Sequence, residues 1–327
     1  MKNDKTLAYY IRGFLTIYLT TRRNSSIHTI SSYRDTIKLF LNYVIAVNEI
    51  DIAKINFEVL TYENINNFLD YLEENRNITT NTRNQRLACI KSFCKYIISY
   101  DPTHLEQLTQ IINIKAKKYK YKNIEYFTKE EISELLQRPN LESKQGAKDL
   151  VIMVLLYDGA LRVSELINLK VEDVFLEPPF KIFIKQAKGN KSREVPVTSD
   201  TVEILKKYKG AFNLKTGDYF IKSNQNKTYT SNGIRKIIKK YTKDFRFNVT
   251  PHTFRHSKAS HLVESGVPLI YIRDLLGHES VETTEIYAKI SNITKNKVIT
   301  DNGIQIDNKI KYNMNEDSNL IEWLSTL

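Results

Sequence analysis

Residues 251–261 read PHTFRHSKASH, and this stretch separates two kinds of site. His252 and His256 are four residues apart, which lets two histidines on one helix hold a metal ion. The helix of a zinc protease has a glutamate directly after its first histidine, but Thr253 stands there. Arg255 would also place a fixed positive charge beside the ion. A His-x-x-Arg pair that grips an anion is therefore the better interpretation, and a metalloprotease is disfavoured.

The composition indicates a basic two-domain protein. The 327 residues exceed what one hydrophobic core usually requires, so we expect two domains. Lys and Arg number 49 against 37 Asp and Glu, giving a formal net charge of +12, which suits a polyanionic partner but also fits a solvated basic surface. We expect a cytoplasmic location and no membrane, because the first residues lack a secretory signal and no apolar run could span a bilayer. Cys89 and Cys94 fall on one expected helix, which disfavours a structural disulfide.

Residues 1–112 are expected to form a helical domain. Helices are predicted from a cap at Asn3 or Asp4 to about residue 18, from Ser25 or Ser26 onward, and over residues 61–74. A fourth follows cap candidates at Thr80 and Thr82, and a short one covers residues 105–112. The second and fourth helices carry cations that could face one groove of DNA, or form an ordinary solvated face: Arg34, Lys38, Arg83, Arg86, Lys91 and Lys95.

Residues 113–124, NIKAKKYKYKNI, are predicted to be the interdomain linker. They contain lysines without a helical apolar period, so we expect an extended segment that either follows a phosphate backbone or is simply solvated. These lysines are Lys115, Lys117, Lys118, Lys120 and Lys122.

The second domain is expected over residues 125–300. TKEE at 128–131 has the spacing of a capping box, and the apolar segment around 150–156 predicts a buried helix. KIFIKQA and REVPVT alternate like strands of a hairpin whose tip is the basic KGNK at 188–191. Helices are expected to resume near residue 230 and to include the histidine-rich stretch.

Residues 301–327 form a tail in which a terminal helix is predicted. Its apolar face needs a docking groove, on its own protomer or on a neighbour. The face comprises Leu320, Ile321, Trp323, Leu324 and Leu327.

Five ordered motifs resemble those of the tyrosine recombinase, or phage-integrase-like, family. LRVSEL at 161–166 is similar to the family's first arginine segment, and KGNKSR at 188–193 to its hairpin lysine segment. HTFRHS at 252–257, LGH at 276–278 and TEIY at 284–287 follow in the family's order. One small departure is that Gly159 and Ala160 stand where a Thr-Gly pair is common. The pieces SSYRDTIKLFLNYV and NTRNQRLACIKSFCKYI are similar, less specifically, to the family's helical core-binding domain.

The resemblance implies a mainly α fold with a small β-hairpin or sheet. It consists of an N-terminal helical, SAM-like core-binding domain and a mixed α/β catalytic domain, which close as a clamp around a DNA half-site. The implied activity is cutting and rejoining double-stranded DNA through a 3′-phosphotyrosyl intermediate without metal or ATP. Four protomers would act on two duplexes with inverted half-sites and exchange strands through a Holliday junction, with a directionality factor as a possible further partner.

The chemistry of this reaction assigns a role to each matched residue. Planar guanidiniums, here Arg162 and Arg255, suit the extra charge on a phosphate under attack. Tyr287 is the predicted nucleophile, and because the ordinary pKa of tyrosine is about 10, it needs a base, for which His252 is the candidate. Lys188 would protonate the leaving 5′ oxygen, and Lys185, Lys191 or Arg193 are its local competitors or phosphate contacts.

The remaining candidates are supporting groups. His278 would donate a hydrogen bond to the phosphate. Glu165 and His256 would hold the catalytic side chains in position without contacting the phosphate themselves. Lys191 and Arg193 are expected to contact DNA. We assign no function to His28 or His104, and we expect His261 to be structural.

Three alternatives stay open. A type IB topoisomerase would relax supercoils on arbitrary DNA, and a noncatalytic DNA-binding module of the same fold would explain the charge without chemistry. No extra N-terminal arm-binding domain is evident, which favours a simple recombinase over the lambda-integrase layout. Among simple recombinases, we place a mobile-element integrase or transposase first and an Xer-like dimer resolvase second.

Overall fold

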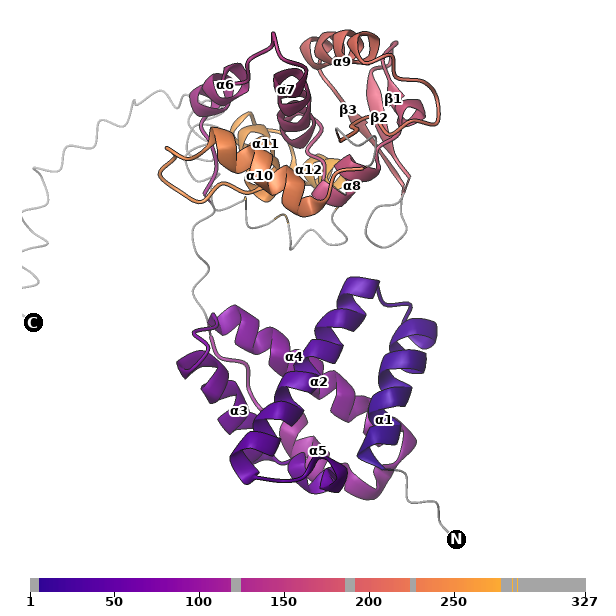
Figure 1. Cartoon of the computed structure of the whole chain (residues 1–327), viewed down its shortest axis with the longest axis vertical. Helices are drawn as coiled ribbons and strands as arrows, with labels where there is room; N and C mark the ends of the chain where they lie inside the picture. Colours follow the sequence, from indigo (N-terminus) through magenta and orange to yellow (C-terminus); the bar gives the residue numbers. More distant parts are fainter. Residues whose placement is uncertain are drawn as a thin grey trace, which may run out of the picture. The chain divides into compact units, whose positions relative to one another are not determined.

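The chain divides into two compact units, residues 1–122 and residues 123–327 (Figure 1). The computed structural model describes residues 6–118, 125–185, 192–223 and 228–277, together with Thr284 and Tyr287. Four predicted site residues, Lys120, Lys122, Lys188 and Lys191, lie outside the described residues, as do His278 and the predicted tail. Among the described residues, no helix is both long and apolar enough to cross a membrane.

The N-terminal unit is a bundle built around α4. Helix α4 contacts α2, α3 and α5, so its apolar side forms the centre of the unit (Figure 1). Its buried residues include Leu87, Phe93 and Ile97. The elements are α1 Leu7–Gly13, η1 Phe14–Arg22, α2 Ile27–Asn48, η2 Ile52–Lys54, η3 Phe57–Val59, α3 Tyr62–Glu74, α4 Thr80–Tyr100, η4 Pro102–His104 and α5 Leu105–Ile112.

Hydroxyl caps fix most of these helix starts. Ser26, one of the two predicted starts, and Thr61 accept hydrogen bonds from the backbone of the first turns of α2 and α3. The start of the first helix differs, because Thr6 is its cap. The cap of α4 is Thr79, one residue before the predicted candidates. After Gly13 the first helix widens into the π-helix η1, which the apolar period alone could not reveal.

The first half of the predicted linker packs on the N-terminal unit. Ile114 is buried in its core, and Lys117 exchanges two backbone hydrogen bonds with the side chain of Asn84, at 2.8 and 3.0 Å. The expectation of an unpacked segment from residue 113 onward is therefore wrong for residues 113–117. Ile114 and the side-chain amide of Asn84 hold this segment on the N-terminal unit, which its lysine-rich composition did not indicate.

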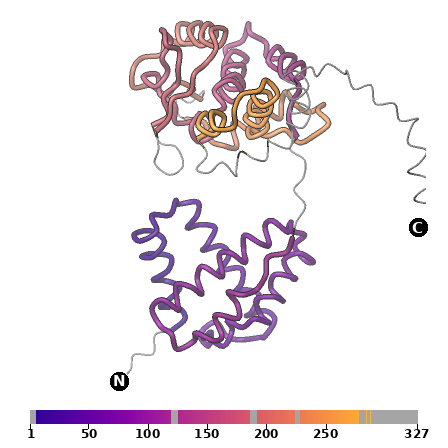
Figure 2. The backbone as a smooth tube through the Cα atoms, turned by 180° about the vertical axis from the view of Figure 1, so that it is seen from behind, coloured from indigo at the N-terminus to yellow at the C-terminus, as the bar shows by residue number. Residues whose placement is uncertain are grey.

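The C-terminal unit surrounds the apolar helix α7. This helix contacts α6, α8, α9, α10 and α11, and its segment 151–156 is fully buried, as predicted. Figure 2 shows α9 and the strands on one flank and the later helices on the other. The helices are α6 Lys129–Gln137, α7 Lys144–Tyr157, α8 Val163–Asn168, η5 Val171–Asp173, α9 Ser199–Ala211, α10 Ser231–Tyr241, α11 Pro251–Glu264 and α12 Leu269–Leu276.

A three-stranded antiparallel sheet of order β1-β2-β3 completes this unit. Strands β2 (Lys181–Ile184) and β3 (Arg193–Pro196) pair with Ile184 opposite Arg193, and β1 (Val174–Phe175) lies beside β2. The predicted hairpin is thus confirmed. The fold class, mainly α with a small β-sheet, is also confirmed.

Candidate active site

Helix α11 carries the HTFRHS motif through the interior of the C-terminal unit. Pro251 occupies its first turn, where a missing N–H costs nothing, and Thr253 accepts a hydrogen bond from the backbone of Thr250 at 3.0 Å. Arg255, one turn on, is only 4% exposed. Its Nη1 donates to the carbonyl of Ala160 at 2.7 Å, and its Nη2 donates to the carbonyl of Leu276.

Arg255 remains a cation in this buried setting. Burial, together with the neighbouring charge of Arg162, lowers its pKa to about 9. Because this value stays above neutrality, the guanidinium is charged at pH 7. A buried cation whose remaining neighbours include a second arginine has a strong preference for an anion.

The turn before α8 aims a carbonyl at Arg255. Ala160 takes φ 44°, in the left-handed region that favours glycine, which explains why a glycine is common at this position in the family. At Gly159, a Cβ would lie 2.7 Å from the carbonyl oxygen of Leu155, so a larger residue at this position would require the backbone to shift. The small departure from the Thr-Gly pattern therefore leaves the turn intact.

Arg162 stands directly before α8 and is clamped by Glu165. One carboxylate oxygen of Glu165 accepts from the backbone N–H of Arg162 and the other from its Nη1, each at 2.8 Å. Arg162 also donates from Nη2 to the carbonyl of Gly277 at 2.7 Å. The predicted supporting role of Glu165 therefore has a concrete form, because this carboxylate holds both the main chain and the side chain of Arg162.

Arg193 is not a surface cation available to DNA. Its side chain is 9% exposed, and both of its Nη atoms donate to the two oxygens of Glu165, each at 2.8 Å. Its Nε donates to the carbonyl of Leu275 at 2.9 Å. These three hydrogen bonds within the protein argue against the predicted DNA contact of Arg193.

Glu165 is ionised between these two arginines. Burial acts to raise its pKa, but hydrogen bonds and positive charge from Arg193 and Arg162 outweigh burial, and the net pKa is lowered. The carboxylate therefore stays a charged acceptor at neutral pH.

Tyr287 lies in a small apolar cluster and faces His256. Its side chain is 1% exposed and packs with Ala160, Ala259 and Leu276. Its hydroxyl lies 2.5 Å from Nδ1 of His256. Burial raises the pKa of Tyr287 to about 12, although the charge of Arg255 opposes this. At neutral pH the hydroxyl is protonated, and it donates this hydrogen bond when Nδ1 of the neutral His256 carries no proton.

The two histidines of the motif have separate surroundings. Burial lowers the pKa of His256 to about 4, helped by His252 and Arg255, so His256 is neutral at pH 7 and able to accept a proton. His252, one turn earlier, is exposed, with its ring centroid 6.4 Å from that of His256. Partial desolvation and the charge of Arg255 lower its pKa as well. The structure thus places His256, rather than His252, against the tyrosine hydroxyl.

One alternative to Lys188 as the general acid is disfavoured by its own contacts. Lys185 forms an ion pair with Asp173 at 2.5 Å, and this hydrogen bond raises the pKa of Lys185, which makes it a poorer proton donor. Lys188 and His278 lie outside the described residues. Within the described part of the chain, no group of three or more His, Cys, Asp or Glu side chains could hold a metal ion.

The predicted DNA-contacting residues of the N-terminal unit fall into two groups. Arg34, Lys38 and Lys95 are exposed, and Arg34 makes an ion pair with Asp35 at 3.7 Å and donates a hydrogen bond to the hydroxyl of Ser31 at 3.2 Å. Arg83 is buried: its side chain is 4% exposed, and its Nε lies 3.2 Å from Glu73. Arg83 therefore does not lie on the exposed basic face that was predicted, since Asp70 and Glu73 of α3 cover it.

Arg86 and Lys91 are tied to neighbouring backbone. Arg86 donates to the carbonyl of Ser32 at 3.2 Å and joins α4 to α2, while Lys91 donates to the carbonyl of Ile114. These bonds leave both residues part-buried rather than free on the predicted face.

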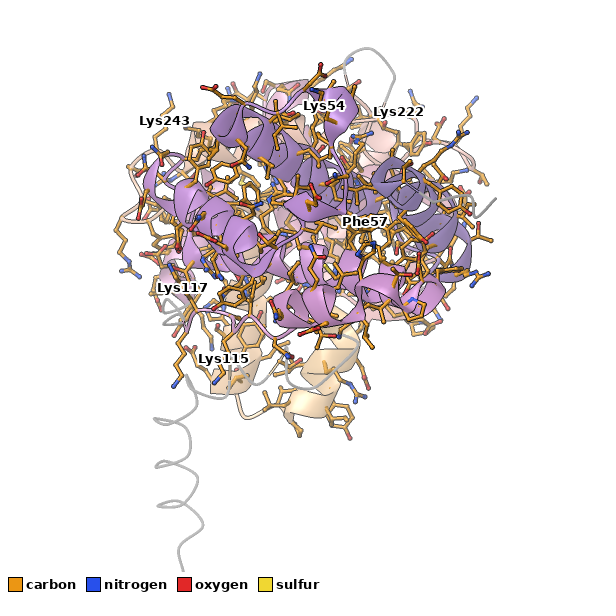
Figure 3. All side chains as sticks on the ribbon, turned by 90° about the horizontal axis from the view of Figure 1, so that it is seen from below. Lys54, Phe57, Lys115, Lys117, Lys222 and Lys243 are labelled. Atoms are coloured by element: carbon orange, nitrogen blue, oxygen red, sulfur yellow. The ribbon has the colours of Figure 1, made fainter. Side chains whose placement is uncertain are left out.

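The described linker lysines are exposed on the N-terminal unit. Figure 3 shows Lys115 and Lys117 at one edge of the structure. All three described lysines are exposed, and Lys117 also forms an ion pair with Glu73 at 2.5 Å. Lys115 and Lys118 therefore fit the predicted role better than Lys117 does.

Two features of the site have no clear signal in the sequence. One is the contact between His256 and Tyr287, although helical spacing does place His256 one turn beyond His252. The other is the use of the carbonyls of residues 275–277 as acceptors for arginines, since every residue has a carbonyl and the sequence cannot mark it.

Comparison with protein families places both units in one family. The model described as the phage integrase family matches residues 125–292, which is more than half of the chain. The model described as the phage integrase N-terminal SAM-like domain matches residues 11–101.

Individual proteins agree with this result. The putative integrase/recombinase y4rC of Sinorhizobium fredii is 28% identical over all of both chains. The tyrosine recombinase XerD of Rickettsia bellii is 32% identical over 86% of this chain and 94% of its own. The Tn1549 transposon integrase, solved in complex with transposon right end DNA, has the same fold, with a TM-score of 0.67 at 14% identity over 89% of this chain and 98% of its own. The chain therefore belongs to the phage integrase family of tyrosine recombinases, enzymes that recombine DNA at specific sites by a tyrosine mechanism.

Proposed function

We propose that this recombinase cleaves double-stranded DNA by attack of Tyr287 on a phosphodiester, forming a 3′-phosphotyrosyl bond. The observation that carries the proposal is the convergence of Arg162 and Arg255 at the end of α12, with Tyr287 in the adjoining apolar cluster. The guanidiniums would neutralise the charge that builds on the nonbridging oxygens during attack.

Residues of this chain can accept and supply each proton that the step transfers. The Tyr287 oxygen forms a bond to phosphorus while the bond from phosphorus to the 5′ oxygen breaks. The proton of Tyr287 passes to Nδ1 of His256, and the 5′ oxygen takes a proton from Lys188. Bond energy stays in the phosphotyrosyl linkage, so a second 5′ hydroxyl can reverse the step and rejoin DNA without ATP or metal.

The assignment of the base shifts from His252 to His256. His256 is neutral and within hydrogen-bond distance of the nucleophile, which are the two requirements for a general base. His252 is exposed beside Arg255 and is placed to orient the phosphate instead.

We assign Lys188 as the general acid, because two of its neighbours are engaged in other contacts. Lys185 is paired with Asp173, and Arg193 is committed to Glu165, so neither is free to serve. Lys191 remains the rival. His278 follows Gly277 directly, and we assign it a hydrogen bond to the phosphate.

DNA is the proposed partner of both units. Arg34, Lys38 and Lys95 on the N-terminal unit, with Lys115 and Lys118 of the connector, would contact phosphates. Four protomers would act on two duplexes with inverted half-sites and exchange strands through a Holliday junction. A directionality factor would be a further partner.

We assign the enzyme first to a mobile genetic element, as an integrase or transposase. The relative named an integrase/recombinase matches along the whole of both chains, which supports this choice. The alternative is dimer resolution, which the XerD relative supports. Mapping the cleaved site decides between them: ends of an element that carries this gene support the first, and a single chromosomal or plasmid site supports the second.

The tail is proposed to join protomers. Deletion of residues 317–327 is expected to weaken assembly on DNA while half-site binding is kept, because an apolar helical face needs a groove. Unchanged assembly in a gel-shift titration would contradict this role.

The decisive experiment is a denaturing gel of the protein incubated with labelled DNA from both flanks of its own gene, with EDTA and without ATP. A covalent adduct that is absent in Tyr287→Phe supports the proposed chemistry. Tight binding without an adduct on any fragment would favour a noncatalytic DNA-binding module.

A further inference from the structure

Three successive carbonyls at the end of α12 each accept a hydrogen bond from a different arginine. Leu275 accepts from Nε of Arg193 at 2.9 Å, Leu276 accepts from Arg255, and Gly277 accepts from Arg162 at 2.7 Å. The last turn of a helix leaves its carbonyls without intrahelical partners and carries partial negative charge. This turn therefore serves as a common anchor for both proposed phosphate-binding arginines and for Arg193.

Arg193 connects the last turn of α12 to Glu165, the carboxylate that holds Arg162. Its two Nη atoms form a paired contact with both oxygens of Glu165, at 2.8 Å each. The same two oxygens hold the main chain and guanidinium of Arg162. A paired contact of this kind fixes orientation as well as position, so Arg193 prevents the carboxylate from rotating away from Arg162.

The space around Arg193 is tight. Gly277 has φ 58°, and a Cβ built there would lie 3.0 Å from both Cδ and Nη1 of Arg193. A larger residue at 277 would therefore both strain the backbone and displace Arg193. Arg193 also begins β3, the return strand of the hairpin, so one side chain connects the hairpin, α8 and α12.

We propose that Arg193 is a positioning residue for DNA cleavage, which acts through Glu165 to hold Arg162 against the scissile phosphate. This inference rests on the proposed function and adds a residue to it. We assign Arg193 no phosphate contact, because each of its three nitrogens already donates a hydrogen bond within the protein. Its removal should therefore impair the recognition of phosphate charge rather than DNA binding as a whole.

The test compares two phosphates at one cleavage site. The probe is the flanking duplex that gives the adduct with wild-type protein, made with a normal scissile phosphate or with a methylphosphonate, which replaces one charged nonbridging oxygen by a neutral methyl group. Because a neutral phosphate needs less guanidinium charge, a defect that acts through Arg162 should shrink on the methylphosphonate.

The variants are Arg193→Gln and the milder Arg193→Lys in the full chain. We expect Arg193→Gln to slow adduct formation about 100-fold on the normal phosphate, since misplacing a catalytic group by about 1 Å has effects of that size. On the methylphosphonate the loss should be at most about 10-fold. Arg193→Lys should show the same pattern more weakly, because lysine cannot make the paired contact.

The control is Arg246→Gln, which breaks an arginine–glutamate pair at the surface, where Arg246 lies 3.5 Å from Glu131 and is 67% exposed. It should cleave both probes at the wild-type rate. Glu165→Gln should reproduce the Arg193→Gln pattern, and the double variant should be no worse than the more impaired single variant.

The possible outcomes distinguish a failure of this inference from a failure of the proposed function. No adduct with wild-type protein on any flank counts against the proposed chemistry. If the wild type reacts, an equal loss on both phosphates in the variants would show a structural role and overturn the inference. Wild-type rates in Arg193→Gln would overturn it as well. Should Arg193→Gln fail to fold by circular dichroism, Arg193→Lys carries the same comparison.

Discussion

The Nδ1 atom of His256 lies 2.5 Å from the hydroxyl oxygen of Tyr287, and their surroundings drive the two pKa values apart. Burial raises the pKa of Tyr287 to about 12 and lowers that of His256 to about 4. The proton therefore resides on the tyrosine at neutral pH, and the pair is uncharged. Transfer of this proton becomes favourable only as the tyrosine oxygen bonds to phosphorus, because the acidity of the hydroxyl rises as that bond forms.

Replacement of His256 by glutamine should slow adduct formation about 100-fold or more, the usual contribution of a general base, while DNA binding changes little. Single-turnover adduct formation at saturating protein measures the rate, and a gel shift measures the binding. His28→Gln is the matched control, because His28 is an exposed histidine of the N-terminal unit to which we assign no function. Equal rates for wild type and His256→Gln would return the role of base to His252.

Acid should destabilise the wild type more than a His256→Phe variant. The folded-state pKa of His256 is about 4 against an ordinary 6.5, so the unfolded chain binds the proton more tightly. Stability is therefore lost as pH falls below about 6.5, and the loss levels off below about 4. At pH 5 the difference between wild type and variant should have changed by about 1–2 kcal/mol relative to pH 7.5.

Urea unfolding followed by circular dichroism at both pH values measures this difference. His28→Phe is the matched control for histidine content, since His28 is an exposed histidine of the N-terminal unit. A difference that stays constant with pH would mean that His256 is not held neutral in the folded state.

The success and failure of the sequence predictions have physical reasons. Helix starts and the hairpin follow from local rules, so Ser26, Thr61 and the capping box at Thr128 were predictable. Solvent exposure of a cation depends on which other element covers it. Arg83 and Arg193 looked like surface charges because their carboxylate partners, Glu73 and Glu165, lie on other helices.

Arg162, Arg255 and Tyr287, which lie near one another in the structure, were predictable because they stand in ordered motifs that resemble those of the family. The use of backbone carbonyls at the end of α12 was not, since it depends on tertiary placement alone. The same holds for His256, whose side of α11 becomes clear only once Tyr287 is placed beside it.

Simultaneous replacement of Arg34, Lys38 and Lys95 by glutamine should weaken DNA binding and flatten its dependence on salt. Each phosphate contact contributes about 0.9 to the slope of log affinity against log salt, so three lost contacts reduce the slope by about 2.7. Binding titrations between 50 and 200 mM salt, about the range over which such contacts dominate, provide the measurement. A triple glutamine variant at the exposed Lys54, Lys206 and Lys207 removes the same charge and should leave the slope nearly unchanged.

Arg83→Ala should destabilise the N-terminal unit by about 2–3 kcal/mol, because it removes a buried stem and one of the two cationic partners of Glu73. Arg83→Met keeps most of the packing and leaves Glu73 paired with Lys117, so its cost should be below about 1 kcal/mol. Neither variant should alter the salt slope of DNA binding, since the guanidinium is covered by α3. Urea unfolding and salt titrations of the same samples separate the two effects. A reduced salt slope with unchanged stability would place Arg83 on the DNA after all, and would mean that α3 moves away from α4 when DNA binds.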